Sequence, residues 1–311
     1  MNQPEKNQLE YIKASNLILA NKGKTFYWAK FLLNKEHATK AVRLYRFCRY
    51  VDDVADEATD PVIASMLLNN IIDALNKGTA DHPIVSDAIT LFKEAKIEID
   101  IPISLVQGVI SDLSLVRIKD EASLIVYCYQ VAGTVGLMMS KIFDIQDSRA
   151  FAHAIDLGIG MQITNICRDV TEDAQMNRRY LPASLIGDIE PSALKNPDNQ
   201  TQQKIRSALS SLLRTADDYY HSGYHGLCFL PIRARLGISI ASGLYQQIGT
   251  NLRNRNYDCW SFRSVVSKKI KIWLTLKALV LGLLDPHYHL YLKAHNSHLH
   301  RSLKKVAYVQ A

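Results

Sequence analysis

The stretch GIGMQITNICRDVTEDAQMNRRYLP, residues 158–182, decides the fold and the chemistry of this 311-residue chain. Gln162, Asn165, Asp169 and Asp173 follow at intervals of three, four and four residues, so on an α-helix they share one face. The other positions of that helix are largely apolar. Burying amides and carboxylates there is costly unless they have partners. Oxygen ligands of this kind suit Mg²⁺, which is often shared with substrate phosphates.

A second acidic stripe lies upstream, in LYRFCRYVDDVADE, residues 44–57. Its helical face carries Tyr45, Arg49, Asp52 and Asp56, with Asp53 at the edge. A lone pair of this spacing is more often a solvated acidic helix end, but apolar flanks indicate a packed helix here. If the two striped helices face each other, their carboxylates could hold a cluster of Mg²⁺ ions that grips a diphosphate and stabilises it as it leaves.

Cations and aromatic rings accompany the two stripes. Arg168, Arg178 and Arg179 could bind phosphate oxygens in a bidentate manner. Aromatic faces could stabilise a carbocation in an apolar pocket, although ordinary core packing is the commoner role for any one ring. The candidates to line such a pocket are Phe26, Tyr27, Tyr45, Tyr127 and Tyr129.

Helical periodicity dominates the rest of the chain, and no stretch shows a strand-turn-strand pattern. Prolines fall between the periodic segments, as expected of helix starts and breaks. We therefore predict an all-α protein: one domain over residues 1–311, with a basic tail from about residue 286. Residues 183–200 are expected to form the longest polar connection. The expected helices lie near 5–20, 36–57, 61–78, 84–96, 102–118, 121–145, 148–177, 202–222, 232–254 and 264–284.

Composition limits the function classes. Hydrophobic residues make up 48% and charged residues 22%, which is ordinary globular usage and argues against a disordered or fibrous chain. The net charge of +7 favours an anionic partner: nucleic acid, an anionic membrane or a phosphorylated substrate. Five scattered cysteines form no CxxC pair, so we expect reduced thiols in a cytosolic protein. The polar N-terminus shows no signal sequence.

The C-terminal region combines lysines with apolar residues. From Ser264 onward this pattern is typical of a peripheral helix on anionic lipid, with a core helix and solvated tail as the equal alternative. The stretch Ile270–Leu284 is too short and too charged to span a bilayer with confidence. Histidines crowd the tail, but imidazole does not suit Mg²⁺. We expect them to be exposed; they are His287, His289, His295, His298 and His300.

Several segments together resemble the squalene/phytoene synthase family, the head-to-head trans-isoprenyl diphosphate synthases. They run in family order through nearly the whole chain, and the tract ending in RRYLP is very specific. The C-terminal third is most similar to the bacterial phytoene synthases. The matching segments are GKTFYWA (23–29), RLYRFCRYVDDVADE (43–57), YCYQVAGTVG (127–136), GMQITNICRDVTEDAQMNRRYLP (160–182) and LYQQIG (244–249), followed by NYDCW.

The resemblance implies an all-α bundle of isoprenoid-synthase type with a central active-site cavity. It implies Mg²⁺, with Mn²⁺ as a possible substitute, held by Asp52, Asp53, Asp56, Asn165, Asp169 and Asp173. Catalytic roles fall to Asp52, Asp56, Asp169, Asp173, Tyr45 and Arg49. Substrate-binding residues would be Lys22, Lys24, Thr25, Phe26, Tyr129, Gln162, Asn165, Arg168, Arg178, Tyr180 and Tyr245. Gly23 departs from the family, which often has a hydroxyl residue there.

The implied reaction joins two geranylgeranyl diphosphate molecules head to head, through a cyclopropyl diphosphate, to give phytoene. It needs no NADPH.

The alternative within the family is a C30 synthase that makes squalene, dehydrosqualene or presqualene diphosphate from farnesyl diphosphate. A cyclising terpene synthase would show a different second motif. A non-enzymatic basic membrane adaptor is the remote alternative. We expect a cytoplasmic, peripherally membrane-associated enzyme with no nucleic-acid partner, and the oligomeric state stays open.

Overall fold

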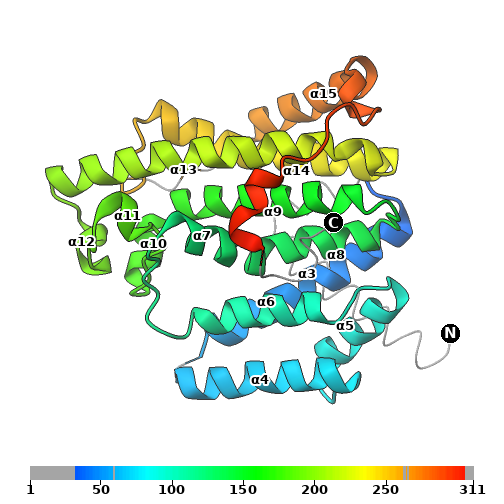
Figure 1. Cartoon of the computed structure of the whole chain (residues 1–311), viewed down its shortest axis with the longest axis horizontal. Helices are drawn as coiled ribbons and strands as arrows, with labels where there is room; N and C mark the ends of the chain where they lie inside the picture. Colours follow the sequence, from blue (N-terminus) through cyan, green and yellow to red (C-terminus); the bar gives the residue numbers. More distant parts are fainter. Residues whose placement is uncertain (1–31, 59, 262–263, 265, 305–311) are drawn as a thin grey trace.

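A computed structural model describes residues 32–58, 60–261, 264 and 266–304 of the chain (Figure 1). The expected helix at 5–20 lies outside the described residues. So do four expected substrate-binding residues, Lys22, Lys24, Thr25 and Phe26, together with the candidate pocket residue Tyr27. These expectations stay predictions.

Helices make up the described part, which contains no β-strand, so the all-α prediction is confirmed. The division of the chain into one domain stays a prediction. The α-helices, labelled as in Figure 1, are α3 (Lys35–Asp56), α4 (Pro61–Lys77), α5 (Pro83–Glu94), α6 (Asp100–Ser111), α7 (Glu121–Cys128), α8 (Thr134–Ile142), α9 (Arg149–Arg168), α10 (Val170–Gln175), α11 (Ala183–Ile186), α12 (Pro191–Lys195), α13 (Asn199–His225), α14 (Ile232–Asn254) and α15 (Lys268–Leu284). A π-helix, η1 (Tyr129–Gly133), joins α7 to α8, and short 3₁₀ turns are η2 (Leu227–Phe229), η3 (Pro286–Tyr288) and η4 (Ser297–Leu303).

Local sequence explains where several helices begin and end. The Asp60 side chain accepts a hydrogen bond from the Val62 amide, and Pro61 occupies the first turn of α4, where its missing N–H costs nothing. Gly78 ends α4 with a left-handed φ of 71°, a conformation that favours glycine. Asp198 caps α13 through the Thr201 amide in the same way as Asp60.

Helix α9 lies at the centre of the bundle (Figure 1). It packs against α13, α8, α14 and η1, while α3 packs against α4, α5 and α6 on the other side. Close approach needs small residues here: a Cβ on Gly158 of α9 would lie 2.3 Å from the Ala132 carbonyl oxygen in η1. The acidic residues of α3 and those at the end of α9 therefore face the same region inside the bundle.

Four expected elements differ from the structure. The helix expected at 121–145 is interrupted by η1 and ends at Ile142. Helix α6 ends at Ser111, seven residues before the expected end, because the chain then turns to pair Arg117 with Arg179 in an isolated bridge. The expected helix at 148–177 breaks at Asp169, whose φ of −103° and ψ of 20° lie between α9 and α10. Residues 183–200 are not a plain loop, because they contain α11 and α12.

The C-terminal segment, residues 285–304, differs from another expectation. The tail histidines are not uniformly exposed, because the chain after α15 folds back over α7 and α9 (red in Figure 1). His300 is buried and His295 is partly buried; both contact Asp156, a fully buried carboxylate on α9. Burial opposes ionisation of Asp156, but hydrogen bonds from the two imidazoles hold its pKa below the usual value. A buried carboxylate needs donors, and the tail supplies them.

One described segment, Glu121–Ile142, has the length and hydropathy of a membrane span, but half of it is buried inside the bundle. Its position in the core explains its apolar composition.

Candidate active site

The two acidic stripes meet around a polar cavity of about 230 Å³. Helix α3 contributes Asp52 and Asp56, and the junction of α9 with α10 contributes Asp169 and Asp173. The break at Asp169 does not disrupt the stripe, because the Asp173 amide still donates to the Asp169 carbonyl over 2.8 Å. The other polar residues that line the cavity are Asp112, Tyr127, Gln162, Asn165, Arg178 and Tyr180.

Ion pairs organise the cavity wall. Arg178 Nη1 lies 3.1 Å from Asp56 Oδ1 and so joins the second acidic segment to the first. Arg49 pairs with Asp53 on α3. Neither Arg49 nor Asp53 borders the polar cavity as the described residues define it, so the expected metal ligand Asp53 does not lie in the cavity wall.

Arg168 forms an ion pair with its neighbour Asp169 at the end of α9. Its guanidinium is therefore held beside the cavity, although Arg168 is not among the described residues that line it.

Crowding of carboxylates disfavours their ionisation in this cavity. Burial raises the pKa of Asp52 to about 7; Asp56 and Asp112 add to that rise, and Arg49 opposes it. Burial, followed by repulsion from Asp169, raises the pKa of Asp173 to about 8. The cavity thus holds more carboxyl groups than its arginines can pair with, as expected of a site for a multivalent cation.

The Asn165 amide supports the same reading. Its oxygen Oδ1 is buried and finds no hydrogen-bond partner among the described residues, while its Nδ2 donates to Gln162 Oε1 over 3.3 Å. An orphaned buried acceptor beside carboxylates is costly without a cation or donor. The donor set is made of oxygen atoms alone, which fits Mg²⁺.

Asp112 is a site residue that the sequence did not reveal. It accepts hydrogen bonds from Tyr180 over 2.6 Å and from Tyr127 over 2.9 Å, and the two rings stack with centroids 4.9 Å apart. Burial raises its pKa. Asp112 follows the last turn of α6 as a single carboxylate, so no spacing pattern marked it.

An apolar cavity of about 290 Å³ adjoins the polar one. The two share four lining residues: Asp52, Val131, Gln162 and Asn165. Val131 belongs to η1, and π-helical turns of this kind occur frequently at functional sites. A molecule with a charged head and a hydrocarbon chain fits such a pair of cavities.

Aromatic and small residues line the apolar cavity. Tyr45 and Tyr245 border it, and burial raises the pKa of both phenols, so each is neutral at physiological pH. Tyr129 is 1% exposed in the core and borders neither cavity within the described part, so the structure does not bring it to the site. Small lining residues leave room along the walls: Ala41, Ala132, Gly136, Ala150, Ala154, Gly158, Gly223, Gly226, Gly237 and Ala241.

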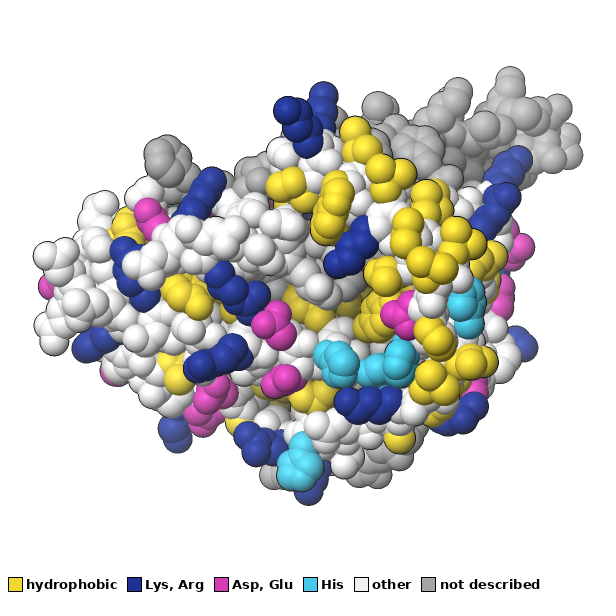
Figure 2. All heavy atoms as spheres, turned by 90° about the horizontal axis from the view of Figure 1, so that it is seen from above, with side chains coloured by type: hydrophobic (Ala, Val, Ile, Leu, Met, Phe, Trp, Pro, Cys, Tyr) yellow, Lys and Arg dark blue, Asp and Glu magenta, His cyan; other side chains and the backbone are white. Residues whose placement is uncertain are grey.

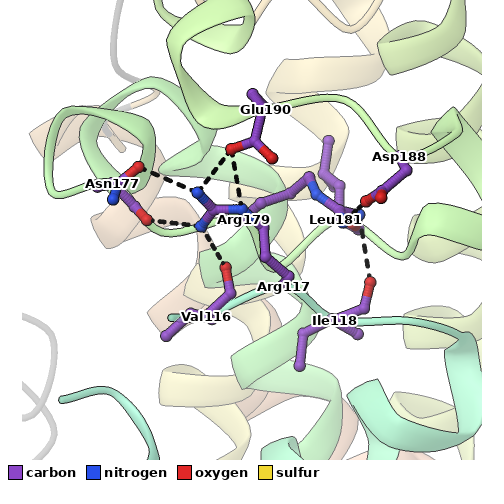
Figure 3. A network of polar contacts seen from close by, with 8 residues as sticks. All are labelled: Val116, Arg117, Ile118, Asn177, Arg179, Leu181, Asp188 and Glu190. Carbon is purple, nitrogen blue, oxygen red and sulfur yellow. Dashed lines mark hydrogen bonds and ion pairs between the residues drawn. The ribbon is translucent and has the colours of Figure 1, made fainter. Parts of the chain in front are cut away.

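Arg179 supports the site without entering it (Figure 3). Its side chain is 1% exposed and donates to the carbonyls of Ile118 and Leu181, with Asp188 as its ion-pair partner. This corrects the expectation that Arg179 could bind phosphate. The network fixes the segment that presents its neighbours Arg178 and Tyr180 to the cavity.

Comparison with known proteins agrees with this geometry. A family model described as squalene/phytoene synthase matches residues 19–271. The chain is 30% identical to a phytoene synthase of Pseudescherichia vulneris, over 84% of this chain and 88% of that one. It is 31% identical to a 15-cis-phytoene synthase of Pantoea ananas, over 82% and 86% of the two chains.

Solved structures show the same fold. A dehydrosqualene synthase, crystallised with a ligand, superimposes with a TM-score of 0.76 at 24% identity, over 89% of this chain and 98% of that one. A squalene synthase from Alicyclobacillus acidocaldarius gives a TM-score of 0.72 at 16% identity, over 83% and 97%. At these identities the likeness concerns the fold alone.

Proposed function

The chain belongs to the squalene/phytoene synthase family, and from that premise we propose that it condenses two geranylgeranyl diphosphate molecules head to head to phytoene. One observation carries the proposal: a carboxylate-lined cavity adjoins an apolar cavity, and Asp52, Gln162 and Asn165 line both. The polar part suits diphosphate groups, and the apolar part suits prenyl chains.

The role of each residue follows from the cavity that it borders. In the first half-reaction the allylic carbon–oxygen bond of one substrate breaks and diphosphate leaves. The double bond of the second substrate attacks that carbon, and loss of a proton closes the cyclopropyl ring. Arg178, at the polar cavity, is placed to bind the departing diphosphate. Tyr45 and Tyr245 border the apolar cavity, which excludes water that would quench the carbocation.

In the second half-reaction the cyclopropylcarbinyl diphosphate loses its own diphosphate, rearranges and releases a proton to give a triene. The same apolar walls protect this second cation. Ring faces such as that of Tyr45 stabilise positive charge that develops next to them.

Divalent metal is part of the proposal. Asp52, Asp56, Asn165, Asp169 and Asp173 would hold Mg²⁺, or Mn²⁺ in its place, whereas Asp53 is not part of the cavity wall that the described residues form. When bound, the ion supplies positive charge that stabilises the leaving diphosphate. Exhaustive treatment with EDTA should abolish turnover, and added Mg²⁺ should restore it. Turnover that survives chelation would refute the metal requirement.

Substrate length is tested by product identification. Purified protein is incubated with Mg²⁺ and either geranylgeranyl or farnesyl diphosphate, and the hydrocarbons are identified by mass spectrometry. We expect a C40 triene from the longer substrate without NADPH, since small residues line the apolar cavity. A C30 product from farnesyl diphosphate, with none from the longer substrate, would assign the chain to the C30 synthases instead.

We also propose that the enzyme works in the cytoplasm at an anionic membrane surface. Helix α15 is fixed to α14 by Leu274 and Ala278, and large apolar side chains on its other positions are exposed. Seen from above, hydrophobic side chains gather there beside lysines (Figure 2). The exposed apolar residues of α15 are Ile272, Trp273, Leu276, Leu279, Val280, Leu283 and Leu284.

A groove on the α15 side of the bundle neighbours the apolar cavity. The groove, of about 250 Å³, runs beside α15, with Trp273 and Lys277 in its lining. It shares Leu157, Gly223 and Leu227 with the apolar cavity, so the apolar cavity and the groove beside α15 have a wall in common. A hydrocarbon product and a lipid-borne substrate make this arrangement useful. Free cysteines fit the reducing cytoplasm.

A further inference from the structure

Three side chains of metal-binding type meet where the C-terminal segment crosses α9. His295 Nε2 lies 2.8 Å from Asp156 Oδ2, and His300 Nε2 lies 2.6 Å from Asp156 Oδ1. The potential ligand atoms all lie within 4.8 Å of one another. Asp156 is 0% exposed, His300 is 6% exposed and His295 is partly buried. None of the three borders the carboxylate cavity as the described residues define it.

We propose that Asp156, His295 and His300 form a binding site for a transition-metal dication, Zn²⁺ being the simplest, which fastens the C-terminal segment to the bundle. Two imidazole nitrogens and one carboxylate oxygen are donors that suit zinc and its neighbours. Mg²⁺ prefers oxygen ligands alone and belongs to the other site. The site is therefore distinct in chemistry from the catalytic one.

The geometry needs only a small adjustment to take an ion. Ligands of a tetrahedral zinc ion lie about 2.0–2.2 Å from the metal, and hence about 3.4 Å from one another. The two hydrogen-bonded contacts, 2.8 and 2.6 Å, are shorter than that, and the other ligand atoms lie within 4.8 Å of one another, so an ion would push the imidazoles away from the carboxylate and draw them toward each other. His295 is partly exposed, so a water molecule from solvent would complete the coordination of such an ion.

Proton balance also permits binding. Each Nε2 gives up its hydrogen bond to Asp156 and turns its lone pair to the ion, and the ring hydrogen moves to Nδ1. For imidazoles in the neutral form this exchange releases no proton, and the Asp156 carboxylate remains a ligand. Ser222 donates from Oγ to Asp156 Oδ2, and His153 Nδ1 lies 3.1 Å from that Oγ. Outer contacts of this kind orient a metal-binding carboxylate.

The site would connect distant parts of the chain. Asp156 is 139 residues from His295 and 144 from His300, so an ion closes a long loop. His153, at the edge of the cluster, also lines the apolar cavity. Binding should consequently raise the melting temperature and protect the C-terminal segment from proteases.

A second pair of neighbouring histidines differs from the Asp156 cluster in its surroundings. His221 and His225 on α13 have Nε2 atoms 3.2 Å apart, but Lys293 Nζ lies 3.3 Å from His221. No carboxylate joins that pair in the clusters found among the described residues. Positive charge beside it disfavours a cation, so this pair serves as a control.

Zinc binding tests the proposal directly, independently of catalysis. The full chain without a histidine tag is stripped with a chelator and dialysed against Zn²⁺, with Mg²⁺ in excess to occupy the carboxylate cavity. Co²⁺ provides an absorption spectrum that reports nitrogen and oxygen ligands. The variants are His300→Gln and His295→Gln, with the exposed His298→Gln of the same segment and His221→Gln as controls.

We expect one tightly bound Zn²⁺ per chain, a higher melting temperature with zinc, and at least tenfold weaker binding in His295→Gln and His300→Gln. Both controls should bind as the parent does. Circular dichroism verifies folding, and the partly exposed His295 provides a usable variant if His300→Gln does not fold. No bound zinc, equal binding by all variants, or loss only in His221→Gln would overturn the proposal.

Discussion

Asp52 and Asp169 face the polar cavity from the two acidic segments, and their loss should affect chemistry more than folding. We predict that Asp52→Ala or Asp169→Ala lowers kcat/KM by at least ~100-fold, about 2.7 kcal/mol of transition-state stabilisation. Removing one carboxylate relieves like-charge crowding in the metal-free protein, which in Asp169→Ala offsets the loss of the Arg168 ion pair, so the melting temperature should change little. The exposed Asp73→Ala on α4 is the matched control. Near-parental rates in either variant would move the site elsewhere.

Asp173 should make the metal-free protein sensitive to pH. Its pKa is about 8 in the folded state, against an ordinary value of 3.8. The folded protein therefore keeps a proton that the unfolded chain releases, and the stability this gives is lost as pH rises from about 4 through 8. Asp173→Asn cannot ionise, so it should match the parent at pH 4 and exceed it at pH 8.

Thermal unfolding in EDTA measures this difference. We expect Asp173→Asn to melt at least about 2 °C above the parent at pH 8, which corresponds to roughly 1 kcal/mol. The exposed Asp218→Asn should show no such dependence on pH. A parent that is the more stable protein at pH 8 would contradict the raised pKa.

Regular spacing determined which residues could be found from sequence. Asp52, Asp56, Asp169 and Asp173 repeat at helical intervals, so their common face was predictable. Asp112 and Asp156 are single carboxylates whose partners come from distant segments. Only the tertiary structure brings Tyr180 to the first and His300 to the second.

At the scale of elements, helix ends with strong local signals were predictable and interior breaks were not. Pro61 and Pro83 stand at the first positions of α4 and α5, as their fixed φ angle favours. The π-helix η1 and the break at Asp169 have no such signal, because apolar periodicity continues through both. Both breaks coincide with contacts that only the folded chain makes. The π-helix η1 packs closely against Gly158 of α9, and Asp169 lies where the polar groups of the cavity converge.

The segment 178–181 should depend on the buried Arg179 guanidinium. We predict that Arg179→Met lowers the free energy of unfolding by about 2–4 kcal/mol, because it leaves the carbonyls of Ile118 and Leu181 without their donor. Turnover should fall as well, since Arg178 and Tyr180 lose their support. Urea unfolding measures the first effect.

Arg214→Met, at an exposed position of α13, is the control for that variant and should stay within about 0.5 kcal/mol of the parent. Equal stability of the two variants would show that the network of Figure 3 is dispensable.

At the scale of the whole molecule, the polar cavity, the apolar cavity and the groove beside α15 follow one another, and each shares wall residues with the next. The carboxylate cavity shares Asp52 with the apolar cavity, which shares Leu157 with the groove beside Trp273. Carboxylates line the polar cavity, whereas Lys and Arg side chains lie beside the exposed apolar side chains of the face drawn in Figure 2. This polarity is what a prenyl diphosphate delivered from a membrane requires.

The last prediction follows from that polarity. Each basic residue near an anionic surface contributes roughly 1 kcal/mol, and the attraction is screened within about 8 Å at physiological salt. We predict reversible binding to anionic vesicles that weakens as salt rises, with less binding to neutral vesicles. Replacing Lys268, Lys269 and Lys271 by Gln should reduce co-sedimentation. Activity on detergent-solubilised substrate should persist, because these lysines line neither cavity. Equal recovery in the supernatant with anionic, neutral and no lipid would exclude α15 as a membrane contact.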